Sequence, residues 1–128
     1  MISEYLNGIQ HIGIPTTHFD ETRAFYEKLG FTVVHEPDAE KCGQRIMFMQ
    51  LKNLMLEFYE EAESGIAGAI NHIAIDCSDV DKAFEEAGKL GLTVVSNGIE
   101  ALPFWEKGIR FFIVEGPNKE RVEIDQKL

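Results

Sequence analysis

Apolar and polar residues alternate in two stretches of the same pattern, GIQHIGI at residues 8–14 and AINHIAI at residues 69–75. In each stretch the isoleucines fall on one face, and a histidine and a small residue fall on the other. This period of two is typical of a β-strand. Each stretch therefore predicts a strand with a histidine, His11 or His72, in its middle.

A helix is predicted after each of these strands, over residues 18–29 and 79–90. A hydroxyl residue with an aspartate three positions later caps a helix start, and apolar residues follow at helical intervals. A glycine ends each predicted helix, because a left-handed helix end favours a residue without Cβ. The residues that mark these ends are Thr17 and Ser78 at the starts and Gly30 and Gly91 at the ends.

Three more strands complete each half of the chain. A β-branched run, FTVV or LTVV, comes directly after each glycine and suits a strand. The first half continues with QRIMFMQL and LMLEFYE, and the second half with IRFFIVEG and RVEIDQ. The order of elements is therefore βαβββ, written twice, which predicts an α+β fold.

The repeat also defines the domain organisation. Module one covers residues 8–60, module two covers residues 69–126, and the polar, glycine-containing stretch 61–68 links them. With 128 residues the chain has the size of one domain, so the two modules are expected to form a single domain. Residues 97–108 have no equal counterpart in module one and predict a loop.

Composition narrows the classes of partner. The net charge of −10 argues against nucleic acid and anionic membranes, since both need clustered Lys and Arg. No apolar run is long enough to span a bilayer. The two cysteines, Cys42 and Cys77, form no disulfide framework and are interpreted as reduced thiols. These features favour a cytoplasmic protein.

Four ionisable residues interrupt the apolar strands at matching places in the two modules. A carboxylate among apolar neighbours must be paired, hydrogen-bonded or bound to a metal ion. A structural role is the default for one such residue, but four in register favour a shared site. Two imidazoles and two carboxylates suit one divalent ion per site, such as Ni, Zn, Co, Mn or Fe. The four candidate metal ligands are His11, Glu57, His72 and Glu123.

The paired modules with these ligands resemble the vicinal oxygen chelate superfamily of glyoxalases, bleomycin-resistance proteins and dioxygenases. The resemblance is carried by HIGIPTTHFDETRAFYEKLGF, INHIAIDCSDVDKAFEEAGKLG and EGPNKERVEID. It implies a curved, half-barrel mixed sheet with helices on its outer face. It also implies a homodimer in which two chains share each metal site.

Within that superfamily, the ligand set resembles the lyases of the glyoxalase I (lactoylglutathione lyase) type. The resemblance implies a metal-dependent lyase or isomerase that acts on a small α-hydroxycarbonyl or hemithioacetal through a metal-chelated enediolate. It makes Glu123 the first candidate for the catalytic base and Glu57 the second. An epimerase of the methylmalonyl-CoA type and a non-catalytic binding or resistance protein are the alternatives.

Substrate-binding residues are less clearly indicated. Pro15 and Glu61 stand where glutathione-using glyoxalases often carry Arg and Asn, so another thiol adduct or a non-thiol substrate is open. Arg45 and Arg110, at matching repeat positions, are candidates for binding the substrate or for solvated strand-edge charges. Trp105 is a candidate for a lid over the substrate. The two histidines without a counterpart, His18 and His35, are interpreted as surface residues.

Overall fold

Two units, Met1–Glu63 and Ser64–Leu128, each fold around a sheet of their own. They are described from a computed structural model, which describes residues 1–5, 7, 9–62 and 70–128. The predicted starts of the modules, Gly8 and Ala69, and most of the predicted linker lie outside the described residues.

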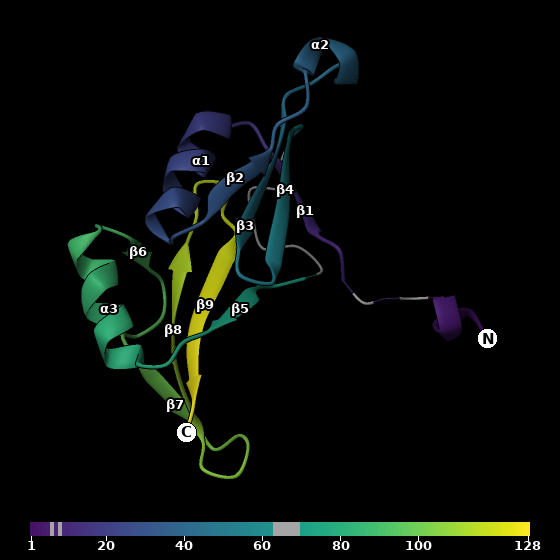
Figure 1. Cartoon of the computed structure of the whole chain (residues 1–128). Coiled ribbons are helices and arrows are strands. Elements are labelled where there is room, and N and C mark those ends of the chain that lie inside the picture. Colours follow the sequence, from purple (N-terminus) through teal and green to yellow (C-terminus); the bar gives the residue numbers. More distant parts are fainter. Residues whose placement is uncertain (6, 8, 63–69) are drawn as a thin grey trace. The chain divides into compact units, whose positions relative to one another are not determined.

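Module one has a four-stranded sheet in the order β1-β4-β3-β2 (Figure 1). Strand β1 runs parallel to β4, and the other neighbours are antiparallel. A short helix, α2, and an N-terminal 3-10 turn at Ile2–Tyr5 were not predicted from the sequence. The elements are β1 Ile12–Thr16, α1 Phe19–Lys28, β2 Thr32–His35, α2 Ala39–Cys42, β3 Ile46–Leu51 and β4 Leu54–Glu60.

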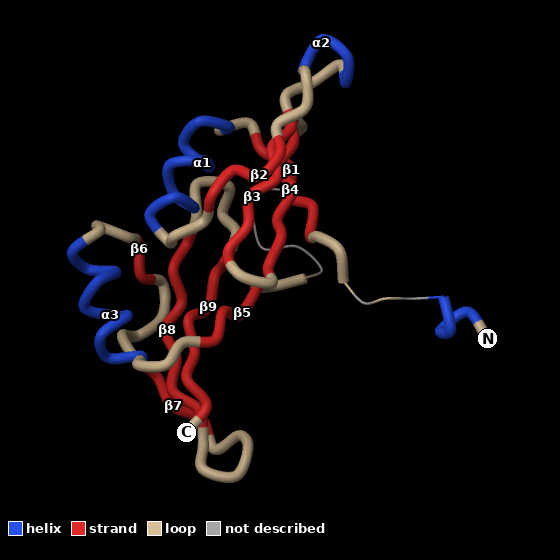
Figure 2. Tube along the Cα trace, viewed as in Figure 1, coloured by secondary structure: helices blue, strands red, loops and turns tan. Residues whose placement is uncertain are grey.

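Module two repeats this arrangement with the strand order β5-β9-β8-β6 (Figure 2). Strand β5 runs parallel to β9, as β1 does to β4. The prediction of a loop over residues 97–108 is wrong in part, because residues 100–102 form a strand, β7, that pairs with β8. The elements are β5 Ile73–Asp76, α3 Val80–Lys89, β6 Thr93–Val94, β7 Glu100–Leu102, β8 Ile109–Glu115 and β9 Arg121–Lys127.

The predicted α+β class is confirmed, and each module contains the predicted βαβββ elements, with α2 added in module one and β7 added in module two. The joining of the two sheets into one half-barrel stays a prediction. Among the helices of the described residues, none is long and apolar enough to cross a bilayer.

Both long helices end in the predicted way. Gly30 has φ 98° and Gly91 has φ 70°, values that residues with a Cβ adopt at a cost. The N–H of the residue after each glycine donates across the helix end, from Phe31 to the carbonyl of Tyr26 and from Leu92 to that of Ala87. These bonds satisfy carbonyls that the helix leaves without partners.

The predicted N-caps are wrong by one residue. Helix α3 begins after Asp79, whose carboxylate accepts a hydrogen bond from the N–H of Lys82, and α1 begins after His18. Thr17 and Ser78 each stand one position before the cap. The sequence pattern located the turn, but the backbone geometry at the first helical residue selects the capping side chain.

Each sheet buries the face that its own helix covers. In module one, the residues on this face include Tyr26 of α1, Met47 and Met49 of β3, and Leu56 and Phe58 of β4. The two methionines fill the core, as the commoner use of alternating methionines predicts. Residues between them along the strands, such as Phe48 and Glu57, lie on the opposite face. That second face of each sheet carries the candidate ligands.

Candidate metal centre

In module one, the first candidate pair joins the start of β1 to the middle of β4. Gly13 of β1 is the register partner of Glu57, and His11 stands two residues before Gly13 on the same side. The His11 Nε2 and the Glu57 Oε1 lie 3.9 Å apart. The two side chains are 35% and 24% exposed, so both are open to a ligand.

Module two builds the same pair from β5 and β9. Ala74 is the register partner of Glu123, and His72 stands two residues before Ala74. The His72 Nε2 and the Glu123 Oε2 lie 3.3 Å apart, and the glutamate is only 14% exposed. The prediction that the histidines lie inside strands is wrong by one residue, because the strands begin at Ile12 and Ile73. Both glutamates lie inside their strands as predicted.

The other ring nitrogen of each histidine meets a neighbouring carboxamide. The His72 Nδ1 lies 3.0 Å from the Asn71 Oδ1, and the His11 Nδ1 contacts the Gln10 Oε1. An amide oxygen accepts only, so the Nδ1 carries the proton and donates. In the neutral ring this leaves a lone pair on Nε2, the atom that faces the glutamate. Two electron-rich atoms so close together favour a cation between them.

The donor set and its spacing fit a divalent metal ion. Bonds from such ions to histidine or carboxylate are about 2.0–2.2 Å long, which places neighbouring ligand atoms about 3–3.5 Å apart. The module-two pair, at 3.3 Å, falls in this range, and the module-one pair, at 3.9 Å, exceeds it by a few tenths of an ångström. Partly exposed side chains can close that difference.

A salt bridge alone explains poorly why a His–Glu pair occurs at the same place in both modules. If the histidines were protonated, each pair would be a partly exposed salt bridge, which typically stabilises a fold by about 0–1 kcal/mol. Among the described residues, groups of three or more such ligands are not found. Each module thus brings together one histidine and one glutamate.

Small residues keep the face beside each pair open. A Cβ on Gly13 would lie 3.6 Å from the Glu57 Oε1 and 3.4 Å from the Tyr59 Cε1. Alanine occupies the matching position, Ala74, in module two. The two small residues thus leave space beside the histidines.

The surface beside the His72–Glu123 pair of module two is acidic. Burial raises the pKa of Glu123, an effect that His72 partly opposes. Asp76 and Asp125 are register partners two residues further along the same face. Burial, and then the negative charge of Asp76, raise the pKa of Asp125. This surface disfavours anions more than neutral molecules.

Arg45 and Arg110 have partners within their own modules. The Arg45 Nη2 lies 3.0 Å from the Asp20 Oδ1, and its guanidinium lies over the Phe19 ring. Arg110 binds both carboxylate oxygens of Asp81, at 2.7 and 2.9 Å. Both aspartates are in the first turn of a helix, so the same ion pair ties helix to sheet in each module. The structure thus gives these arginines an architectural role.

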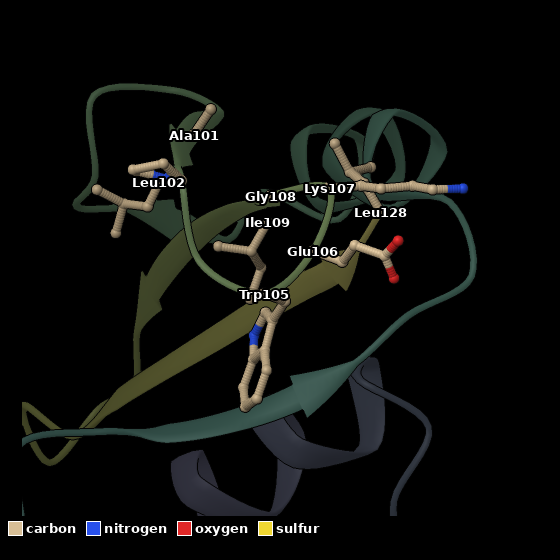
Figure 3. A pocket seen from close by; sticks show the side chains of 9 residues that line it. Ala101, Leu102, Trp105, Glu106, Lys107, Gly108, Ile109 and Leu128 are labelled. Carbon is tan, nitrogen blue, oxygen red and sulfur yellow. The ribbon is translucent and has the colours of Figure 1, made fainter.

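Trp105 lies in module two on the loop between β7 and β8 (Figure 3). It is 66% exposed and lines a hollow of about 330 Å³ together with Leu102, Ile109 and the C-terminal Leu128. The Lys127 Nζ lies 4.7 Å from the centre of its ring. Lys127 is four residues beyond Glu123 on β9, a separation of about 13 Å along a strand. Within module two, Trp105 is therefore not brought to the His72–Glu123 pair.

Two residues on the site face of module one were not recognised from the sequence. Phe48 of β3 is the register partner of Glu57, and its ring contacts the edge of His11. His35 pairs with Phe48 from the next strand. His35 is exposed, as predicted, but it is on the same face as the pair. No local signal marks these positions, because cross-strand register brings them together.

The family follows from comparison with known proteins. The model of the Glyoxalase/Bleomycin resistance protein/Dioxygenase superfamily matches residues 8–124. The chain therefore belongs to this superfamily. It is also 28% identical over 115 residues to the uncharacterised protein YwkD of Bacillus subtilis (strain 168), an alignment that covers 84% of this chain and 88% of YwkD.

Solved structures share the fold. A glyoxalase family protein from Enterococcus faecalis has a TM-score of 0.76 at 18% identity, over 94% of this chain and 98% of that one. The fosfomycin resistance protein FosX from Listeria monocytogenes has a TM-score of 0.74 at 17% identity, over 96% and 95%. One structure of that FosX is a complex with Mn(II) and sulfate. At these identities the likeness concerns the fold alone.

Proposed function

We propose that the protein is a divalent metal-dependent lyase or isomerase of the glyoxalase I type, acting on a hemithioacetal or a small α-hydroxycarbonyl compound. The observation that carries the proposal is the duplicated His–Glu pair, with nitrogen–oxygen separations of 3.9 and 3.3 Å. His11, Glu57, His72 and Glu123 would hold the ion. When bound, a divalent ion supplies a Lewis acid that acidifies the C–H between two substrate oxygens.

Glu123 is the proposed base. It would take the proton from one substrate carbon and return it to the neighbouring carbon, so that no atom is gained or lost overall. Its side chain is only 14% exposed, so little bulk water reaches the carboxylate. Glu57, which is more exposed, is the second candidate.

The carboxamides of Gln10 and Asn71 hold the two histidines in the tautomer that binds a metal ion through Nε2. Both ring nitrogens then have defined tasks, one as hydrogen-bond donor and the other as ligand. A protein that only sequesters small molecules needs neither the pairs nor these supports. Their presence in both modules favours catalysis over sequestration.

The charges beside the site bear on the substrate. Asp76 and Asp125 make the site face of module two acidic, and Arg45 and Arg110 are occupied by helix aspartates. A strongly anionic substrate, such as a phosphonate, would be repelled by this face. We therefore propose a substrate whose reacting part is neutral, such as a hemithioacetal.

The direct test combines metal analysis with an assay. Purified protein is expected to hold about one divalent ion per chain and to isomerise hemithioacetals formed from methylglyoxal and several thiols. Glu57→Gln and Glu123→Gln should each lose metal and turnover together, because each variant removes one anionic ligand.

The matched control is Glu115→Gln, which changes a glutamate of β8 that pairs with Lys119. It should keep both metal and activity. Full metal content in both ligand variants would contradict the ligand assignment. Full metal in the wild type without turnover of any hemithioacetal would contradict the reaction.

A further inference from the structure

Three side chains form a row across the open face of module one. The His11 ring meets Phe48 edge-on with centroids 5.5 Å apart, and the His35 ring lies against Phe48 at 5.8 Å with an interplanar angle of 35°. We call His11, Phe48 and His35 the aromatic row. It begins at the His11–Glu57 pair and runs from there over β3 to β2.

A bulge in β2 places His35 at the end of this row. Val33 pairs with Met49, which is fully buried on the helix side of the sheet. Regular alternation would put His35 on that same side, two residues later. The register instead shifts between Val33 and His35, so that His35 pairs with Phe48. Bulges next to active sites commonly redirect a side chain in this way.

The His35 ring is available to a ligand. It is exposed, and in the part of the chain that the structure describes its nitrogens make no hydrogen bond or ion pair. The matching residue of module two, Ser96, is already engaged. Its hydroxyl accepts from the N–H of Ile113 and donates to the carbonyl of Gly98. Of these two matching residues, His35 is therefore the one whose polar group is unused among the described residues.

Phe48 also differs from its counterpart. Its equivalent beside Glu123 is Ile113, an aliphatic residue. A half-exposed phenylalanine between two imidazoles offers a flat surface that suits another aromatic ring. Glu57 on β4 and His35 on β2 are separated by two strand spacings, about 10 Å. One aromatic ring with a polar group at its far end spans this interval.

We propose that Phe48 and His35 determine which substrates the enzyme prefers, by binding an aromatic substituent that carries a hydroxyl group at its far end. The ring of the substituent packs on Phe48, and His35 hydrogen-bonds to the hydroxyl. The preferred substrate class is then an arylglyoxal adduct rather than the methylglyoxal adduct. This inference rests on the proposed metal site.

Hydroxamates test the inference without turnover, because they bind metal ions through two neighbouring oxygens. Affinities of acetohydroxamate, benzohydroxamate and 4-hydroxybenzohydroxamate for the Zn²⁺-loaded protein are measured by calorimetry. Benzohydroxamate is expected to bind about tenfold more tightly than acetohydroxamate, and the para-hydroxyl to add about another three- to tenfold. Methyl-, phenyl- and 4-hydroxyphenylglyoxal adducts should follow the same order in kcat/KM.

Variants assign each gain to its residue. Phe48→Leu, which keeps an apolar side chain, should remove most of the preference for the aromatic ring. His35→Ala should remove the gain from the para-hydroxyl alone, and His35→Gln, which can still hydrogen-bond, should restore part of it. Ile113→Ala is the matched control in module two and should leave both preferences unchanged.

The outcomes separate this inference from the proposed function. Equal binding of acetohydroxamate and benzohydroxamate would overturn the inference while the metal site stands. A preference that survives in Phe48→Leu, or that is lost in Ile113→Ala instead, would place the ring elsewhere and also overturn it. Failure of the wild type to bind Zn²⁺ or any hydroxamate would overturn both proposals.

Discussion

At the scale of single residues, the proposed chemistry depends on how each histidine is held. Asn71 and Gln10 directly precede His72 and His11 in the chain, so each histidine is held by its own neighbour in sequence. Consecutive residues of a strand face opposite sides, but both histidines lie just before their strands begin. That position lets the carboxamide turn back to the imidazole.

Removing this support should weaken metal binding. Asn71→Ala is expected to lower the affinity for Zn²⁺ about 10- to 100-fold, because the free imidazole loses its fixed tautomer and orientation. Competition with a chelating dye measures the affinity. Asn97→Ala, an asparagine outside the pair, should leave it unchanged. An unaltered affinity in Asn71→Ala would mean that the strand alone orients the ring.

A second residue-scale feature is the buried carboxyl group of Glu120 in the turn between β8 and β9. Its Oε2 is buried without a hydrogen-bond partner among the described residues, and a Cβ on Gly116 would lie 1.6 Å from its Oε1. Burial raises the pKa of Glu120, although hydrogen bonds from Asn118 oppose this. The folded state therefore favours the neutral acid.

Glu120 should make stability fall as pH rises. Its pKa is higher in the folded than in the unfolded chain, so its stabilising contribution is present in acid and is lost as pH passes the raised value. Glu120→Gln, which stays neutral, should gain stability relative to the wild type as pH rises from the ordinary glutamate pKa, about 4.3, through the raised value. Urea unfolding across this range measures the difference. A constant difference would show that the carboxyl group does not titrate differently on folding.

At the scale of elements, two local signals gave most of the fold. The period of two marked the strands, and glycine after an apolar helical stripe marked the helix ends, as the φ values of Gly30 and Gly91 confirm. The caps were misplaced by one residue because several neighbouring side chains can cap. Strand β7 was missed because its residues, Glu100–Leu102, are all exposed and carry no apolar alternation.

Two glycines near the end of α3 allow a matched test of backbone conformation. Gly88 lies inside the helix and Gly91 lies in the left-handed region, and a Cβ on either would meet no atom within 4 Å. Gly91→Ala should therefore destabilise the protein by about 1–2 kcal/mol through backbone strain alone. Gly88→Ala should stabilise it by about 0.5–1 kcal/mol.

Urea unfolding measures the free energy of unfolding of both variants. Because both add the same methyl group, opposite changes in stability cannot come from side-chain size. Gly91→Asn should cost less than Gly91→Ala, since asparagine tolerates the left-handed conformation better. Equal stabilities of the two Gly91 variants would argue against a backbone origin.

At the scale of the whole molecule, each module presents one His–Glu pair, and the four proposed ligands are divided between the two modules. The two pairs are related by the internal repeat and have the same register, Gly13 with Glu57 and Ala74 with Glu123. We propose that the protein is a homodimer in which module one of one chain and module two of its partner complete each site. Symmetric dimers of this kind contain two equal sites.

Mixing two inactive variants tests the shared site. In a hybrid of His11→Ala and His72→Ala chains, one site combines both defects and the other has neither. Random mixing should therefore restore about a quarter of the wild-type activity, since half of the dimers are hybrids with one intact site. Mass spectrometry verifies that hybrids form. Verified hybrids without activity would mean that each site is built within one chain.

The sequence by itself determined the repeat, the strand and long helix that open each module, the helix ends, and the four ionisable residues that form the two His–Glu pairs. These follow from local periodicity, from glycine's backbone freedom and from the recurrence of four ionisable residues at matching places. The pairing of His with Glu needed only the parallel contact of the first and last strand, which both modules repeat.

Only the tertiary structure decided which other side chains stand beside these pairs. The bulge in β2 turned His35 onto the site face, cross-strand register placed Phe48 next to Glu57, and the helix aspartates engaged Arg45 and Arg110. The physical reason is the same in each case. These contacts join residues far apart in the chain, so their geometry is set by strand register and packing rather than by any local pattern.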